Sequence, residues 1–286
     1  TQLKILFISK YACPPTYGFG SRLIYLAKYL GKSGHDLRLI TSDANHSAFN
    51  WPNSKETFND ICIDGCNLLW VKTRKYKKTT SIDRILSWVD FELKVFYLLF
   101  VKRYFLKPDI VVVSSLSFFS IINGLLYKMF FKTKLVFEVR DIWPLTLTEE
   151  GGFSSLNPLI IILRAIELVG YRFSDLVVGT MPGLKKHVNT GRLDKRVICI
   201  PIGYDEIPEN KDIHFNFLKN SNFNPNKITI AYAGSIGITN ALDNFIEAIK
   251  LNKNENVQFI IIGDGDLKEK YKRKLSSQDN IIFGPR

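Results

Sequence analysis

The sequence has few of the residues that mark metal-binding or disulfide-stabilised proteins. Its 286 residues include four Cys and four His. Cys62 and Cys66 are four positions apart, but no His pair or second Cys pair completes a zinc pattern. We therefore expect isolated thiols in a reducing compartment, and we predict no metal and no other cofactor.

Long apolar runs are also missing. No stretch reaches the roughly 18 uninterrupted apolar residues that a membrane-spanning helix needs. Residues 91–106 and 116–131 come nearest, and polar side chains interrupt both, as is typical of helices that are buried or lie at an interface. Residues 3–9 are too short and too β-branched for a signal peptide. Global disorder is excluded, because 46% of the residues are hydrophobic and 23% are charged.

The charge is positive and unevenly distributed. The formal net charge is +12, and residues 1–205 contain 28 Lys and Arg against 17 Asp and Glu, whereas residues 206–286 contain 11 against 10. A basic surface can bind nucleic acid, anionic lipid or a phosphorylated substrate. We do not expect nucleic-acid binding, because the basic residues do not cluster in a recognised module.

Short apolar runs alternate with helical patterns along the first two thirds of the chain. The expected strands are 3–9, 37–41, 68–72, 109–113, 134–139, 175–179 and 196–201. The expected helices are 20–33, 82–106, 116–131, 157–173 and 183–189. Continuous apolar strands that alternate with helices predict a doubly wound α/β domain with a parallel sheet.

The pattern then restarts after a polar stretch. Residues 206–226 contain several Asn and two Pro, which is typical of a linker. Strands are expected at 228–233, 257–262 and 280–283, with helices at 241–251 and 266–275. We therefore predict domains at 1–205 and 227–286 joined by a linker at 206–226. Because a complete doubly wound domain has about five or six strands, we expect the second domain to be only partly present.

A glycine-containing loop follows the first strand. Gly18 and Gly20 precede a helix that opens near Ser21. Glycine allows close backbone approach and a helix N-terminus attracts anions, so this loop is a candidate substrate site. The alternative is a loop that caps the helix, since the third glycine of a dinucleotide fingerprint is absent.

Charged residues end the strand at 134–139. Glu138, Arg140 and Asp141 fall where open parallel sheets bind ligands, outside the carboxyl ends of the strands. Arg140 can clamp a phosphate or carboxylate, and Asp141 can accept a sugar hydroxyl or orient Arg140. We take Arg140 and Asp141 as candidate catalytic residues and Glu138 as a candidate substrate contact. The alternative is a structural ion pair.

Two similar strand-to-helix turns occur in the second domain. Their small residues could offer backbone N–H groups to a diphosphate, or could simply make tight turns. The candidate nucleotide-binding residues are Gly234, Ser235, Gly237, Gly263, Gly265 and Lys268. The segment 200–205, Ile-Pro-Ile-Gly-Tyr-Asp, is a candidate hinge between the domains or an ordinary surface turn.

Together these strings resemble glycosyltransferase family 4, over essentially the whole chain. The string at 140–144, Arg-Asp-Ile-Trp-Pro, is similar to the Asp-x-Trp-Pro element of a subgroup that builds capsule and O-antigen repeat units, which includes relatives of N-acetyl-fucosaminyl transferases. The strings at 201–205, 233–237 and 263–265 are similar to the family's domain-closing turn and nucleotide-side loops.

The resemblance implies a GT-B fold, with two Rossmann-like domains facing across a cleft. It implies a retaining transferase that needs no metal. The nucleotide sugar, which we expect to be UDP-linked, would bind mainly to the second domain, and the acceptor would bind mainly to the first. Two departures bear on the donor site. Ser235 stands where many relatives have Arg, and the family's Glu-x₇-Glu element is expected beyond residue 286.

The expected acceptor is a lipid-linked saccharide at the inner face of the cell membrane, which suits the basic first domain. Residues 91–107 could lie in that interface, or could form a core helix with a solvated edge. Two other functions stay open at this point. The first is a non-catalytic fragment or a protein that binds a membrane surface or a partner. The second is a GT-B-type epimerase of sugar nucleotides.

Overall fold

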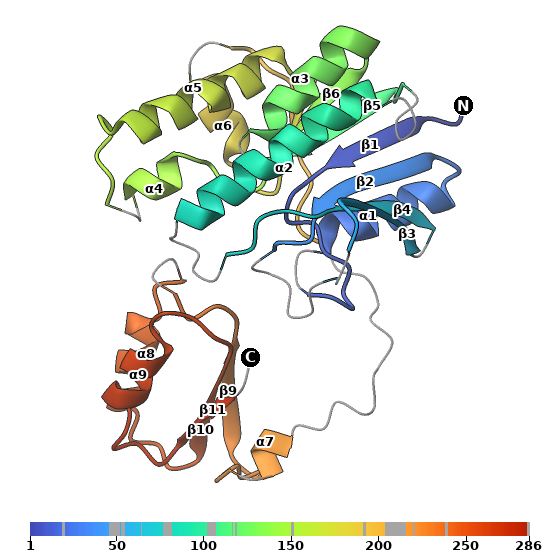
Figure 1. The fold of residues 1–286 in the computed structure, drawn as a ribbon. Coiled ribbons are helices and arrows are strands. Elements are labelled where there is room, and N and C mark those ends of the chain that lie inside the picture. Colours follow the sequence, from blue (N-terminus) through green and yellow to red (C-terminus); the bar gives the residue numbers. More distant parts are fainter. Residues whose placement is uncertain are drawn as a thin grey trace. The chain divides into compact units, whose positions relative to one another are not determined.

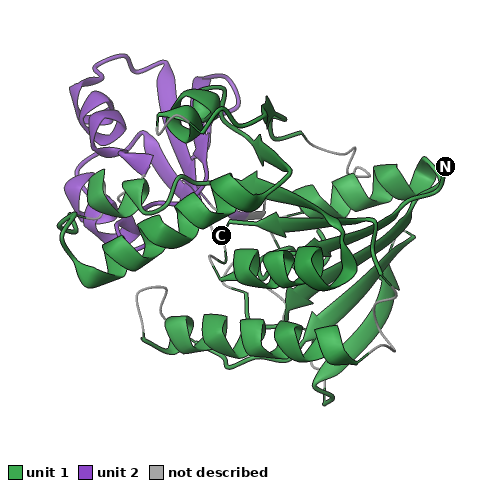
Figure 2. Cartoon of the chain, turned by 90° about the horizontal axis from the view of Figure 1, so that it is seen from above, with its two compact units in different colours: residues 1–205 green, residues 206–286 purple. Residues whose placement is uncertain are grey.

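The computed structural model describes residues 1–18, 21–45, 52, 55–63, 65–76, 82–101, 107–115, 117, 119–149, 152–190, 193–203, 216–219, 221–237 and 240–284. These residues form two compact units, 1–205 and 206–286 (Figure 2). Among the helices in these ranges, none is both long and apolar enough to cross a lipid bilayer.

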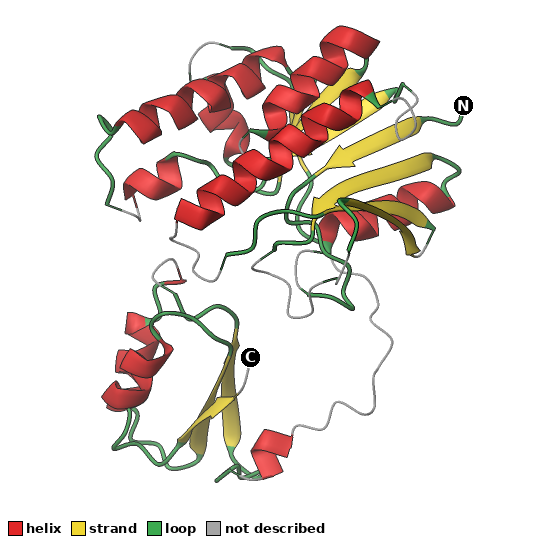
Figure 3. Ribbon diagram, in the orientation of Figure 1, coloured by secondary structure: helices red, strands yellow, loops and turns green. Residues whose placement is uncertain are grey.

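The first unit is a sheet of eight strands with helices on both faces (Figures 1 and 3). Its strands are β1 (Lys4–Ile8), β2 (Asp36–Ser42), β3 (Phe58–Ile63), β4 (Cys66–Val71), β5 (Ile110–Ser114), β6 (Lys134–Val139), β7 (Leu176–Gly179) and β8 (Val197–Cys199). Its helices are α1 (Arg22–Lys32), α2 (Ile82–Phe100), α3 (Ser120–Phe131), α4 (Leu145–Glu149), α5 (Pro158–Phe173) and α6 (Leu184–Asn189). The strand order is β3-β4-β2-β1-β5-β6-β7-β8.

The predicted parallel sheet is confirmed, with one addition. All neighbouring pairs are parallel except β3 and β4, which are antiparallel. Strand β3 was not predicted. It alternates half-buried and exposed positions at the edge of the sheet, so it lacks the continuous apolar run of the inner strands.

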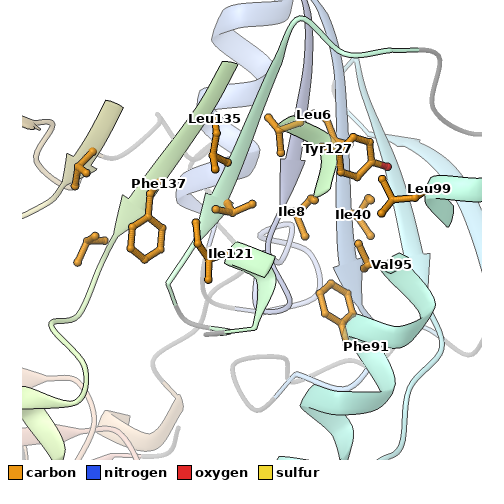
Figure 4. Close-up of a cluster of buried hydrophobic side chains, with 14 of the residues drawn as sticks. Leu6, Ile8, Ile40, Phe91, Val95, Leu99, Ile121, Tyr127, Leu135 and Phe137 are labelled. Atoms are coloured by element: carbon orange, nitrogen blue, oxygen red, sulfur yellow. The ribbon is translucent and has the colours of Figure 1, made fainter. Parts of the chain in front are cut away.

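Two apolar cores cover the two faces of this sheet. On one face, α2 and α3 pack Phe91, Val95 and Ile121 against Ile8 of β1 and the neighbouring strands (Figure 4). On the other face, α1 packs on β1, β2 and β4. Because an inner strand such as β5 contributes side chains to the cores on both faces, its sequence is apolar at successive positions, as predicted.

The second unit is a smaller parallel sheet. It contains α7 (Asn216–Lys219), β9 (Ile228–Ala233), α8 (Asp243–Leu251), β10 (Val257–Ile262), α9 (Lys268–Lys274) and β11 (Ile281–Gly284), with strand order β11-β10-β9. Its core is formed by side chains of α8, α9 and β10, together with Ile236 and Leu242 from the segment between β9 and α8. Strand β9 is exposed along most of its length.

Part of the predicted linker belongs to this second unit. Helix α7 lies within 206–226, and Phe217 lies close to Gly284 at the end of β11. Gln258 of β10 accepts a hydrogen bond from the Asn224 N–H and donates one to the Asn224 carbonyl. The described part of 206–226 is therefore packed structure, which corrects the prediction of a linker up to residue 226.

Candidate functional site

The first candidate site lies where the strand order of the large sheet reverses. From β1 the chain proceeds outward through β2, and it later returns to place β5 on the other side of β1. Ligands of open α/β sheets bind outside the carboxyl ends of strands at such a point. Gly18 and Ser21 follow β1, and Glu138, Arg140 and Asp141 end or follow β6. Gly20 lies outside the described residues.

The loop before α1 is held by its own backbone. The N–H groups of Tyr17 and Gly18 both donate to the Pro14 carbonyl, at 2.9 and 3.1 Å. Ser21 is the N-cap residue of α1, but its side chain makes no capping hydrogen bond. The predicted roles of Gly18 and Ser21 in substrate binding stay predictions.

A buried ion pair anchors the start of α1 to the sheet. The Arg22 Nε atom lies 2.9 Å from Glu138 Oε1, and the two residues are only 7% and 2% exposed. The other two guanidinium nitrogens donate to the carbonyls of Pro201 and Ile200, at 2.7 and 2.9 Å. Arg22 thus joins α1, β6 and the segment after β8. Glu138 has a structural partner, and Arg22 was not predicted from the sequence.

Further buried polar atoms lie level with Glu138 across the sheet. Ser114 of β5 pairs with Glu138 of β6. Ile8 of β1 pairs with Val113 of β5, so Ser9, the next residue, lies beside Ser114. Their side chains share the face covered by α1, because Phe7 and Val112 belong to the core on that face. Ser9 Oγ, Ser114 Oγ and Glu138 Oε2 have no hydrogen-bond partner among the described residues. Buried polar atoms of this kind are expected to be satisfied by a polar group that reaches them.

Arg140 and Asp141 form the turn that follows β6. The Ser115 N–H donates to the Glu138 carbonyl at 2.8 Å, and Ser115 Oγ accepts the Arg140 N–H at 3.0 Å. These bonds fix the backbone of Arg140, whose side chain is half-buried. Partial desolvation raises the pKa of the Asp141 carboxyl, and the charge of Arg140 opposes that rise. The turn therefore presents one cation and one carboxylate on a fixed backbone at the sheet's carboxyl edge.

A second charged layer lies on the opposite face of the same edge. The ammonium of Lys10, directly after β1, donates to Ser42 Oγ, the Ala44 carbonyl and Ser87 Oγ, at 3.1, 3.2 and 2.9 Å. Lys10 is fully buried, and this burial lowers its pKa to about 7 against the attraction of Glu92, Asp43 and Asp90.

Glu92 of α2 is the buried carboxylate of this layer. It accepts hydrogen bonds from Ser117 Oγ, Ser120 Oγ and Asn123 Nδ2, at 2.6, 2.6 and 2.7 Å. Burial raises its pKa, against these three bonds. The network fastens α2 to α3, because the acceptor belongs to α2 and every donor comes from α3 or the loop before it.

The second candidate site is made of two loops in the second unit. Residues 234–237 follow β9 and residues 263–265 follow β10, and the backbones of these loops touch. A Cβ atom on Gly263 would lie 1.8 Å from the Gly234 carbonyl oxygen, and one on Gly265 would lie 2.4 Å from the Ile236 carbonyl oxygen. The φ angles of Gly263 and Gly265 are +146° and +156°. Glycine is therefore required at both positions.

Some of the predicted diphosphate donors are already engaged within the fold. The Gly234 N–H donates to the Ile262 carbonyl at 2.9 Å, so this group is engaged within the fold, and the contact of Gly234 with a nucleotide stays a prediction. The Lys268 ammonium donates to the Gly263 and Gly284 carbonyls, at 2.7 and 3.0 Å. Lys268 thus fastens the loop to β11, and its contact with a nucleotide stays a prediction, as do those of Ser235 and Gly237.

Within the described ranges, no three His, Cys, Asp or Glu side chains lie close enough together to hold a metal ion. Arg22, Ser9 and Ser114 were not predicted from the sequence, and neither were the hydrogen bonds of Lys10 and Glu92. A polar residue that ends an apolar strand, as Ser9 and Ser114 do, was the signal that could have revealed part of this edge.

No protein-family model matches the chain. In sequence, the chain is 24% identical over 297 aligned positions to a putative colanic acid biosynthesis glycosyl transferase, WcaI of Escherichia coli (strain K12), and the match covers 99% of this chain and 72% of that protein.

Among solved structures, sucrose-phosphate synthase of Thermosynechococcus elongatus matches with a TM-score of 0.70 and 14% identity, covering 100% of this chain and 71% of that one. WaaG, a glycosyltransferase involved in lipopolysaccharide biosynthesis, matches with a TM-score of 0.62, 16% identity and coverage of 98% and 70%. Anabaena HepE in complex with UDP-glucose matches with a TM-score of 0.58, 14% identity and coverage of 99% and 69%. The chain has the GT-B fold of these neighbours, as predicted.

Proposed function

We propose that this chain is a retaining glycosyltransferase that moves a sugar from UDP to a lipid-linked saccharide during assembly of a bacterial surface polysaccharide of the capsule or O-antigen kind. The observation that carries the proposal is the sequence match to a putative colanic acid glycosyl transferase along 99% of the chain, together with the GT-B fold. We place the reaction in the cytoplasm, at the inner face of the cell membrane.

The second unit would bind the donor. Its touching loops at 234–237 and 263–265 form a rigid backbone surface at the carboxyl ends of β9 and β10, where nucleotides bind in doubly wound sheets. A neighbour with the same fold is described in complex with UDP-glucose, which supports a UDP-linked donor. Backbone N–H groups of Ser235 and Gly237 are the proposed contacts to the diphosphate.

The first unit would bind the acceptor. Arg140 and Asp141 are the proposed contacts to the reacting groups, because they combine a permanent positive charge with a carboxylate on a fixed turn. In the proposed transfer, the bond between the sugar C1 and the diphosphate oxygen breaks, and the acceptor oxygen bonds to C1. The acceptor's hydroxyl proton leaves with the departing diphosphate. Arg140 would stabilise the developing charge, which is often the largest single contribution to catalysis.

The proposal is tested by measuring UDP release from UDP-glucose and other UDP-sugars, with and without a lipid-linked saccharide. We expect release that depends on the acceptor and persists in EDTA. Arg140→Ala should lower turnover by about 100-fold, the size of effect seen when a charge-stabilising group is removed. Arg273→Ala, an exposed arginine of α9, is the matched control and should leave turnover unchanged.

Other outcomes would point to other functions. Product formation without any acceptor would favour an epimerase of sugar nucleotides. Absence of saturable binding of UDP and UDP-sugars would favour a non-catalytic protein. Loss of activity in EDTA would contradict the metal-independent mechanism.

A further inference from the structure

Three helices of the first unit carry an apolar surface on the side that faces away from the sheet. Helices α2, α3 and α5 lie next to one another over one face (Figures 1 and 3). Sixteen of the 24 exposed large apolar side chains in the described part of the chain belong to these three helices. A soluble monomer rarely exposes a contiguous apolar surface of this kind without a partner.

Four exposed apolar side chains of this surface lie where the three helices end. Phe100 closes α2, Met129 and Phe130 lie near the end of α3, and Phe173 closes α5; they are 62, 73, 60 and 50% exposed. The rings of Phe100 and Phe130 are 6.5 Å apart, so these helix ends are neighbours. The Phe173 carbonyl accepts a hydrogen bond from Lys128 of α3 at 2.9 Å. We call these four residues the apolar corner.

Basic side chains lie at or beside the ends of α3 and α5 that carry the apolar corner. They are Lys128, Lys132, Lys134, Arg172 and Lys195. Lys128 and Lys134 share one acidic partner, Asp175, at 2.8 and 3.8 Å. Lys195 donates to the Arg172 carbonyl at 3.2 Å, which places it at the same helix end. Burial lowers the pKa of Lys195, and the nearby charge of Lys128 lowers it further by a smaller amount. Five cations outnumber the nearby carboxylates of Asp109, Asp175 and Asp194, so the rim of the corner is net positive.

We propose that the apolar corner inserts into the surface of an anionic lipid bilayer while the surrounding cations contact lipid phosphates. Exposed aromatic and aliphatic side chains ringed by Lys and Arg are what an interfacial membrane contact requires. A second copy of the chain is a poorer occupant, because pairing two corners would bring five cations of each copy together. This surface gives a location to the membrane contact in the proposed function, and it can be tested without sugar transfer.

The test is co-sedimentation of the 286-residue chain with vesicles of phosphatidylcholine, with or without about 30% phosphatidylglycerol. We expect binding to the anionic vesicles that weakens as salt is added, and much weaker binding to neutral ones. The Met129→Glu/Phe130→Glu variant should lower the partition coefficient about tenfold or more, because large apolar side chains that leave the bilayer lose a factor of that order each. Lys132→Glu/Lys134→Glu should reduce both the binding and its salt dependence.

Tyr29→Glu is the matched control. Tyr29 is an exposed aromatic residue of α1, which covers the opposite face of the sheet, so this variant should bind vesicles as the wild type does. Circular dichroism would verify that each variant is folded, and UDP-glucose titration of the corner variant should match the wild type.

Two results would overturn the proposal. One is vesicle binding that the Met129→Glu/Phe130→Glu change leaves intact. The other is a wild type that does not bind anionic vesicles but forms a dimer in sedimentation velocity that the same change dissociates. The second result would make another copy of the chain the occupant of the corner. Neither result depends on whether UDP-glucose binds, so the proposed function would be judged separately.

Discussion

The two units of this chain build the carboxyl edge of a parallel sheet in different ways. In the first unit, charged side chains are buried at that edge, with Arg22 against Glu138 on one face and Lys10 near Glu92 on the other. In the second unit, the corresponding edge consists of two loops whose backbones touch at Gly234 and Gly263. Both edges follow from the same local order of a strand, a loop and a helix.

One local order of elements can therefore yield two kinds of site. A side-chain site depends on ion pairs whose partners lie far apart in the sequence, and it loses stability when one partner is removed. A backbone site depends on glycine, and it fails when a single Cβ atom is added. Substitutions that act on one unit and not on the other can therefore test the comparison.

The largest effect is expected from Arg22→Met. This change leaves the buried Glu138 carboxylate without its cation, which typically costs about 3–5 kcal/mol. All four tryptophans of the chain lie within residues 1–205, so urea unfolding followed by Trp fluorescence reports on the first unit. We expect its midpoint to fall sharply.

A double variant provides the control for this pair. Arg22→Met/Glu138→Met removes both charges, and replacing a buried ion pair by apolar residues is often close to neutral. The double variant should therefore be more stable than Arg22→Met alone. If Arg22→Met cost less than about 1 kcal/mol, the pair would contribute no more than a surface ion pair does.

Gly263→Ala should have the next largest effect, confined to the second unit. The added Cβ would meet the Gly234 carbonyl oxygen at 1.8 Å, and the φ angle of +146° disfavours any other residue. We expect a loss of about 3 kcal/mol, measured by hydrogen exchange of β10, with the Trp fluorescence transition unchanged. Gly237→Ala is the matched control, because its Cβ would find the nearest atom at 3.7 Å. Equal effects of the two changes would argue against close backbone packing.

A smaller effect is expected from the pH dependence that Lys10 contributes. Burial lowers its folded pKa to about 7, so at higher pH the unfolded state binds more protons and stability rises with pH. Relative to Lys10→Met, the wild type should gain about 1 kcal/mol per pH unit between about pH 7 and 8.5. At higher pH the buried thiols Cys13 and Cys66, whose pKa burial raises to about 12, act in the opposite direction, but they do so in both proteins and cancel in this comparison. A parallel pH dependence of both proteins would mean that Lys10 is not held in this way.

Much of the fold could be predicted because its signals are local. The strand at 134–139 coincides with β6, and the strands at 228–233 and 257–262 coincide with β9 and β10, since continuous apolar runs mark strands of a parallel sheet. Strand β3 and helix α4 were missed, because the first lies at an edge and the second has no buried residues. Their sequences therefore lack a strong apolar pattern.

The site was less predictable because its contacts are not local. Glycine marked the loops at 234–237 and 263–265, since glycine has a local conformational reason to be there. Arg22 and Glu138 are 116 positions apart, so no spacing connects them before the fold is known. Lys268 looked available for a diphosphate, and the fold directs its ammonium to two backbone carbonyls instead.

The most direct test of the central claim is calorimetric titration of UDP-glucose into the wild type, Gly263→Ala and Arg22→Met/Glu138→Met. If the second unit binds the donor through its backbone loops, the wild type will show saturable binding, Gly263→Ala will abolish it, and the double variant in the first unit will retain it. Saturable binding that survives Gly263→Ala, or no saturable binding by the wild type, would contradict the claim.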